Sequence, residues 1–345
     1  NNEYLQRPIG TGPYKFGAYD GTKVELTRND KWFRGRPPYA KIVATLIPDV
    51  TLAGKAFENN DIDWIYTGQV ASMSEFSRMK NLPGNSGEVY FSFFELLEFN
   101  VAKAPFDNPK VRQAFAYGID REELNKKIFL GMGLTQTNPV FPEWLWATSK
   151  DVKISYNLET ANKLLDEAGL KRGADGTRLS VKISYAAPYS PPPEFVDVLK
   201  SQLEKLGISV AHEPNQWDVW RKKVYTDRNF DVALHHTIVV GDPEIGLADE
   251  VVPGRLYYFG YENAEIVDLY KQAAAKTTRA DRNKIYATLQ QKLAEAMPYT
   301  ALVAAPTPML WKTAVIGGIL KGDVYRLRYA QPPVRVTATK TTRPT

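Results

Sequence analysis

Alternating polar and apolar positions predict short β-strands in the first part of the chain. Residues 23–28 alternate charged or polar side chains with apolar ones, as a half-buried strand does. Residues 41–47 and 61–65 also have strand character. Between them, apolar residues recur at helical spacing after Asp49, which is a typical N-cap residue of a helix. This part of the chain therefore predicts several strands and one helix.

The middle of the chain alternates helices with strands. Asn108, Asp120 and Asn157 each precede a run of apolar residues at helical spacing and predict three capped helices. A strand, a helix and a second strand then follow at residues 179–185, 191–206 and 208–211. Three later helices are predicted at residues 217–225, 264–275 and 280–296. This order indicates an α/β domain, and the flanking pieces indicate a second domain into which it is inserted.

Two further segments are predicted as strands that carry candidate binding residues. Residues 89–101 predict one long aromatic strand, on which Tyr90 and Phe93 point to opposite faces. Residues 230–237 alternate strictly, so the adjacent His235 and His236 also point to opposite faces. One face of each strand belongs to a core and the other is available to line a cleft. The sequence leaves open which face is which.

The composition is that of an ordinary globular protein. The chain has 345 residues, of which 43% are hydrophobic and 24% charged, enough for two or three lobes and unlike a disordered protein. The 44 Lys+Arg and 39 Asp+Glu are scattered, so no basic stripe or tail predicts nucleic-acid binding. The 19 Tyr, 15 Phe and 7 Trp often stand beside prolines and glycines. Aromatic residues in loops indicate a recognition surface.

The absence of cysteine excludes disulfides, thiolate nucleophiles and cysteine-bound metals. The three histidines are His212, His235 and His236. Because the last two point to opposite faces of a strand, they would not easily share an ion. We therefore expect no metal and no cofactor.

The sequence predicts no membrane-spanning segment. No apolar stretch approaches the roughly 20 residues that a helix needs to cross a bilayer. The longest, residues 300–311, is interrupted by Pro306 and Pro308. Residues 1–8 have neither the basic nor the apolar region of a signal peptide, as expected of a mature or trimmed chain.

A series of short motifs resembles a known family. The early ones are Gly10-Thr11-Gly12-Pro13-Tyr14, Asn29-Asp30-Lys31-Trp32-Phe33 and Glu98-Phe99-Asn100. The later ones are Pro105-Phe106-Asp107-Asn108-Pro109, Gly118-Ile119-Asp120-Arg121, Asp242-Pro243, Gly260-Tyr261-Glu262-Asn263 and Met297-Pro298-Tyr299. In this order they are similar to the family 5 extracellular solute-binding proteins of ABC importers, the oligopeptide, dipeptide and nickel group. The resemblance extends to about Lys312.

The resemblance implies an α/β fold of the periplasmic-binding-protein-like type II class, with two lobes joined by a hinge. Lobe I would comprise residues 1–99 and 298–345, and lobe II would be the inserted α/β domain, residues 100–297. Family members begin about one domain further upstream, so the N-terminal part of lobe I and a small extra domain are expected to be absent. The implied protein is a monomeric periplasmic receptor that closes on a small-molecule or peptide ligand and delivers it to ABC transporter permease subunits.

The candidate ligand-binding residues lie on the strands, helices and loops expected near the cleft. A closing cleft needs aromatic platforms and a few polar groups to hold a small polar solute. The candidates are Trp217, His235, His236, Tyr90, Phe93, Trp144 and Asp242. Trp217 shares a helix face with Trp220, which also fits a core position, and Asp242 also fits the cap of a turn.

The family resemblance also bears on the solute. In peptide-binding members, an aspartate that holds the α-amine of the substrate usually lies four residues before the proline of the Asp-Pro pair. That position here is Val239. A sugar, an opine or another small solute is therefore favoured over a peptide with a free α-amine.

The alternative is a glycan-processing or other hydrolytic enzyme that uses surface carboxylates. Asp61 and Asp63 would share one strand face, as glycosidase acids do, although a solvated strand edge explains them more simply. The segment from Gly10 to Gly12 lacks the Lys-Ser/Thr of a phosphate loop and the third glycine of a dinucleotide fingerprint. No serine lies in a nucleophile elbow, and we expect no catalytic residue.

Overall fold

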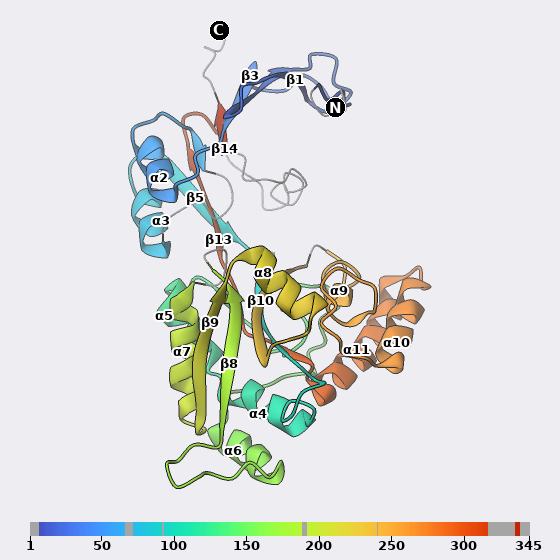
Figure 1. Ribbon diagram of the computed structural model, residues 1–345. Helices are drawn as coiled ribbons and strands as arrows, with labels where there is room; N and C mark the ends of the chain where they lie inside the picture. The colour runs from blue at the N-terminus through green and yellow to red at the C-terminus, as the bar shows by residue number, and fades with distance from the viewer. Residues whose placement is uncertain are drawn as a thin grey trace. The chain divides into compact units, whose positions relative to one another are not determined.

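The strands and helices belong to two compact units. The computed structural model describes residues 7–65, 72–91, 93–187, 192–239, 241–316 and 335–338, and its elements are drawn in Figure 1. Contacts between Cα atoms divide the chain into unit 1, residues 1–90 and 307–345, and unit 2, residues 91–306. The lobe boundaries expected after residues 99 and 297 stay a prediction, because a lobe is defined by a hinge motion and these units are defined by contacts.

The described residues of unit 1 form two antiparallel sheets and two helices. The first sheet has the order β1-β2-β3-β14, with β1 at Tyr14–Tyr19, β2 at Lys23–Arg28, β3 at Lys41–Thr45 and β14 at Arg335–Ala338. The second has the order β4-β13-β5, with β4 at Trp64–Ile65, β13 at Thr307–Lys312 and β5 at Asn85–Tyr90. The helices are α2 (Val50–Glu58) and α3 (Met73–Lys80). The Asp49 carboxylate accepts a hydrogen bond from Leu52 N at 2.8 Å, which confirms the predicted N-cap of α2.

Unit 2 is built on a mixed five-stranded sheet with the order β11-β6-β10-β8-β9. Its strands are β6 (Phe93–Phe99), β8 (Leu179–Ala186), β9 (Ile208–Asn215), β10 (Val232–Ile238) and β11 (Tyr299–Ala301). The pairs β8–β9 and β8–β10 are parallel, whereas β6 pairs antiparallel with both β10 and β11. The predicted βαβ unit is confirmed as β8, α7 (Pro193–Glu204) and β9. A separate small sheet joins β7 (Leu134–Thr135) to β12 (Val303–Ala304).

Two apolar clusters cover the two faces of this sheet. Leu97, Val232 and Leu234 pack in one cluster with residues of α4 (Pro109–Gly118), α5 (Arg121–Phe129), α6 (Leu158–Glu167) and α7. Leu96 and Ala233, which point the other way, pack in the second cluster with residues of the later helices. Those helices are α8 (Trp217–Arg221), η1 (Lys222–Thr226), α9 (Leu247–Val251), α10 (Ala264–Ala274) and α11 (Arg279–Ala296). Each sheet face is therefore buried, as the α/β prediction requires.

The predicted helix caps of unit 2 are confirmed. Asn108 accepts a hydrogen bond from Lys110 N at 3.0 Å at the start of α4, and Asn157 accepts one from Thr160 N at 2.8 Å at the start of α6. Asp120 accepts two, from the backbone N–H groups of residues 122 and 123, at the start of α5. These bonds satisfy donors that the first turn of a helix leaves without an intrahelical partner.

Two predictions from local pattern were wrong. The single strand at residues 89–101 is two strands, β5 of unit 1 and β6 of unit 2, because each pairs with different partners. Asp61 and Asp63 lie in bends before the two-residue β4, so they do not share a strand face.

The helix predicted at residues 217–225 is confirmed as the short α8 continued by the π-helix η1. Within η1 the hydrogen bonds have the wider π spacing, and Asp227 N donates to Lys222 O at 2.8 Å.

Among the described residues, no helix has the length and apolar character that crossing a lipid bilayer requires.

Candidate functional site

The carboxyl end of β10 is where the fold gathers most of the candidate residues. Ligands of open α/β sheets bind beside the carboxyl ends of parallel strands, and β10 and β9 are followed there by α9 and α8. His235 is buried at 4% exposure, whereas His236 is half-buried. The structure thus places His235 as the core member of the pair.

A stack of rings leads from the surface into this core. Trp217 is half-buried and stacks on the buried Trp220 with ring centroids 5.5 Å apart and planes inclined by 26°. Trp220 stacks in turn on His235 at 5.3 Å and 28°. Tyr257 lies 5.2 Å from the His235 ring, and Tyr225 lies 6.0 Å from it. We call these five residues the β10 ring cluster; its outer end is Trp217, the residue predicted to be the main aromatic platform.

His236 and Phe93 lie together beside the ring cluster. The His236 ring is 5.6 Å from that of His235 and nearly parallel to it, at 15°. Phe93, the first residue of β6, meets His236 edge-on at 4.9 Å. Tyr90 is not part of this group, because it ends β5 of unit 1, where it packs with Met309 and Trp311. Ser92, two residues after Tyr90, lies outside the described residues.

Trp144 and Asp242 contact two different sets of residues in unit 2. Trp144 is half-buried, with Phe91 stacked at 6.4 Å and Phe94 edge-on at 5.9 Å. The Asp242 carboxylate accepts hydrogen bonds from two nitrogens of Arg282, at 2.6 and 2.7 Å, and from Glu244 N at 3.1 Å. It therefore caps its own turn, which the sequence analysis left as the alternative role.

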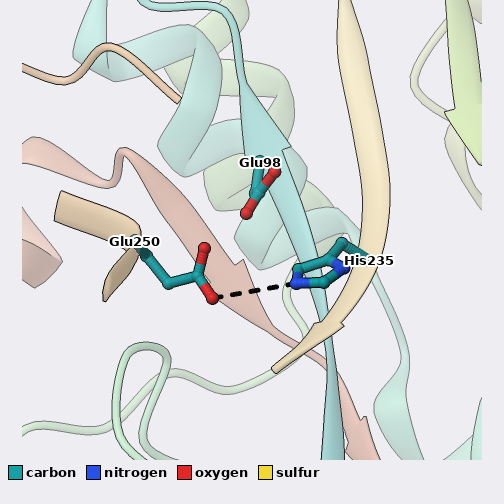
Figure 2. A group of neighbouring side chains, drawn as sticks. All are labelled: Glu98, His235 and Glu250. Carbon is teal, nitrogen blue, oxygen red and sulfur yellow. Dashed lines mark ion pairs between the residues drawn. The ribbon is translucent and has the colours of Figure 1, made fainter. Parts of the chain in front are cut away.

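His235, the innermost member of the ring cluster, also lies beside two buried carboxyl groups, those of Glu98 and Glu250. Ala233 is opposite Glu98 and Leu96 is opposite His235 in the β6–β10 ladder, so Glu98 and His235 are diagonal neighbours on one sheet face. Glu250 reaches the same place from α9, and Figure 2 shows the three side chains converging. One ligand-type atom from each lies within 4.8 Å of the others, and Glu250 Oε1 is 3.8 Å from His235 Nε2.

The electrostatics of these three groups follow from burial. Burial raises the pKa of Glu98 well above its usual range, and the nearby Glu250 charge adds to the rise. Burial also raises the pKa of Glu250, to about 8. Burial lowers the pKa of His235 well below its usual range, and His236 adds to that effect. Burial thus favours the protonated form of both carboxyl groups and the neutral form of the imidazole.

Local sequence patterns predicted no role for Glu98 or Glu250, and they bore on the histidines only as a pair. The available signal is Glu98 itself, a charged residue on a strand whose neighbours Leu96, Leu97 and Phe99 are all fully buried. A charge at such a position is rarely buried without a partner, and the partner here is more than 130 residues away in the sequence.

Asn100, the last residue of the Glu98-Phe99-Asn100 motif, bonds to backbone groups just before β10. Its side-chain amide donates to Arg228 O and to Phe230 O, both at 2.9 Å, and its backbone N–H donates to Asp231 O at 3.1 Å. Asn100 thus fixes the end of β6 to the chain entering β10.

Comparisons with known proteins agree on one family. The model of bacterial extracellular solute-binding proteins, family 5 middle, matches residues 1–248. The chain is 28% identical over 319 residues to the oligopeptide-binding protein AppA of Bacillus subtilis, covering 87% of this chain and 58% of that protein. It is 25% identical over 292 residues to heme-binding protein A of Haemophilus influenzae, covering 82% and 52%. The chain therefore spans about half the length of the curated relatives it matches.

Solved structures agree on the fold. The AppA structure from Bacillus subtilis in complex with a nonapeptide aligns with a TM-score of 0.71 at 25% identity, over 95% of this chain and 67% of that one. A putative peptide-binding protein AppA from Clostridium difficile aligns with a TM-score of 0.78 at 19% identity, over 90% and 64%. The α/β fold of the type II periplasmic-binding-protein class, predicted from the motif series, is confirmed.

Proposed function

The chain belongs to the bacterial extracellular solute-binding proteins of family 5, and from this premise we propose that it is the solute-capturing part of an ABC importer receptor. Family members are periplasmic or extracellular binding proteins, and the relatives above are named as binding proteins rather than enzymes. Capture requires no bond to be made or broken. Solute binding shifts an equilibrium between open and closed lobes, and the permease subunits of the transporter recognise the closed form.

The observation that carries the proposal within this fold is the half-exposed Trp217 at the outer end of the β10 ring cluster. Its ring is held by Trp220, which is itself packed against His235, so the platform is rigid before a solute arrives. A pre-oriented aromatic face loses little conformational entropy on binding and stacks on the apolar face of a sugar or a planar group. His236, Phe93 and Trp144 of unit 2 are further proposed contacts, whereas the Asp242 carboxylate is already occupied by Arg282.

Val239 bears on the class of solute. It is fully buried, at the position where peptide-binding members of the family carry an aspartate for the substrate amine. Without that carboxylate, a free ammonium group gains nothing at this position. We propose that the receptor takes a small solute, such as an opine, a sugar or a blocked peptide, without selecting for a free α-amine.

The test is a titration of the protein with peptides, opines and oligosaccharides, read by tryptophan fluorescence and by the melting temperature. Trp217→Ala should weaken binding of the cognate solute by about two- to tenfold, since a stacking contact contributes roughly 0.5–1.5 kcal/mol. The matched control is Trp32→Phe, which alters a half-buried tryptophan of unit 1 and should leave affinity unchanged.

Two results would oppose the proposal. A panel in which no compound changes fluorescence or melting temperature would remove the support for solute capture. Separately, a peptide that binds at least tenfold better than its N-acetylated form would overturn the solute class while leaving the receptor function standing.

A further inference from the structure

Glu98, His235 and Glu250 form a buried group for which no contact with the solute is proposed. Each is almost completely buried, with exposures of 0%, 4% and 0%. They come from three elements, β6, β10 and α9, and Figure 2 shows all three side chains directed into one space. The group lies entirely within unit 2.

The polar atoms of this group lack partners. Among the residues that the structure describes, no hydrogen-bond partner lies at Oε1 of Glu98 or at either carboxyl oxygen of Glu250. His235 Nε2 also has no hydrogen-bond partner there. Buried polar atoms are almost always satisfied, so several open ones facing each other need a cause. A proton shared between the carboxyls satisfies one contact and leaves His235 Nε2 open.

We propose that these three side chains bind one divalent transition-metal ion, with Zn²⁺ as the preferred ion. Two carboxylates neutralise the two charges of the cation, so the occupied site carries no net buried charge. One imidazole nitrogen and carboxylate oxygens are donors that suit Zn²⁺ and its first-row neighbours, whereas Mg²⁺ and Ca²⁺ prefer oxygen alone. The inference is independent of the proposed function, because the ion would be resident in the core of unit 2 and would not be the captured solute.

The geometry is close to what such an ion requires. With bonds of about 2.1 Å, the ligand atoms of a tetrahedral zinc lie about 3.4 Å apart. The observed 3.8 Å between Glu250 Oε1 and His235 Nε2 needs only a small contraction, and the remaining atoms are within 4.8 Å. The Tyr225 hydroxyl lies 3.5 Å from Glu98 Oε2, on the rim of the group, where an outer hydrogen bond would orient a ligating carboxylate. Thr237 of β10 is buried, and its hydroxyl likewise has no hydrogen-bond partner among the residues that the structure describes, so it offers a fourth oxygen.

The experiment measures binding of the metal alone to the full chain. The protein is stripped with a chelator and, because the ligands are buried, refolded from urea with ZnCl₂ before dialysis and elemental analysis. We expect one Zn²⁺ per chain and a higher melting temperature. Co²⁺ in its place should give visible d–d absorption, and X-ray absorption of the zinc form should show one imidazole, oxygen ligands and no sulfur.

Variants assign the site. Glu98→Gln and Glu250→Gln keep the size of a neutral carboxyl but remove the anion, and each should weaken Zn²⁺ binding by at least a hundredfold. The matched control is His212→Gln, which removes an imidazole that lies 3.2 Å from Asp197 outside the group and should bind Zn²⁺ like the original chain. If either glutamine variant fails to fold, the X-ray absorption spectrum of the unaltered chain decides the ligand set.

The proposal is overturned if the unaltered chain holds no stoichiometric Zn²⁺, Co²⁺ or Mn²⁺ after refolding. It is also overturned if the glutamine variants bind as well as the original chain, or if the zinc spectrum contains no imidazole. In any of these cases the group is a proton-sharing carboxyl pair only.

Discussion

Replacing Gly246 with alanine should distort the segment that connects β10 to α9. Gly246 precedes α9 with φ 97° and ψ −64°, a backbone conformation that residues with a Cβ rarely adopt. An added Cβ would also lie 1.9 Å from Ile238 O, the carbonyl of the last residue of β10. Real Cβ contacts are essentially never under 3.0 Å, so the backbone must move by at least the difference, 1.1 Å.

The magnitude follows from two separate costs. Holding an alanine at positive φ destabilises the folded state by about 1–2 kcal/mol. Alanine also lowers the conformational entropy of the unfolded chain, which offsets about 0.4–1 kcal/mol of that loss. Moving backbone to relieve a clash costs about a further 1–3 kcal/mol. Gly246→Ala should therefore lower the free energy of unfolding by about 1–4.5 kcal/mol in total.

The matched control is Gly241→Ala in the same connection. Gly241 also has a positive φ, 73°, but nothing lies within 4 Å of an added Cβ. It should show the backbone cost without the clash, about 1 kcal/mol or less. Urea denaturation followed by tryptophan fluorescence suits the comparison, because Trp144, Trp146, Trp217 and Trp220 all lie in unit 2. Equal destabilisation by the two alanines, within about 0.5 kcal/mol, would refute the clash argument.

Three further predictions rest on single contacts of unit 2. Arg112 is buried, and its Nε donates to Ala296 O and Met297 O, both at 3.0 Å. Arg112→Met should therefore lower the free energy of unfolding by about 3–5 kcal/mol, and Arg112→Lys should lower it by less. Urea titrations of both variants check this order. Asp231, although burial opposes it, has a pKa below its usual range because Lys103 and the Lys182 N–H bind its carboxylate. The stability that this carboxylate contributes to the folded chain is complete above the unfolded pKa of about 3.9 and is lost as the pH falls through the lower folded pKa. Asp231→Asn should therefore flatten the dependence of the free energy of unfolding on pH in that acid range. An unchanged pH dependence there would contradict the assignment. Asp242→Asn weakens the two-bond pair with Arg282 and should cost about 1 kcal/mol at low salt and less in 1 M NaCl, which melting temperatures at both salt concentrations can compare.

Features that depend on neighbours along the chain could be predicted from the amino-acid sequence. Asp49, Asn108, Asp120 and Asn157 were predicted as helix caps, and all four accept backbone hydrogen bonds from residues two or three positions later. Such contacts need no tertiary structure, because the acceptor and the donor lie within one turn. The ordered motif series, likewise a property of the chain alone, identified the family and with it the fold.

The pairing of strands and the meeting of distant side chains, in contrast, follow from long-range contacts in the folded chain. The aromatic segment at residues 89–101 divides between two units because β5 pairs with β13, while β6 pairs with β10 and β11. The β6–β10 register then sets Glu98 beside His235, and α9 brings Glu250 to them. A one-residue shift in that register would turn every side chain of β6 to the other face. The position of these charges is therefore a consequence of long-range pairing, which no local pattern encodes.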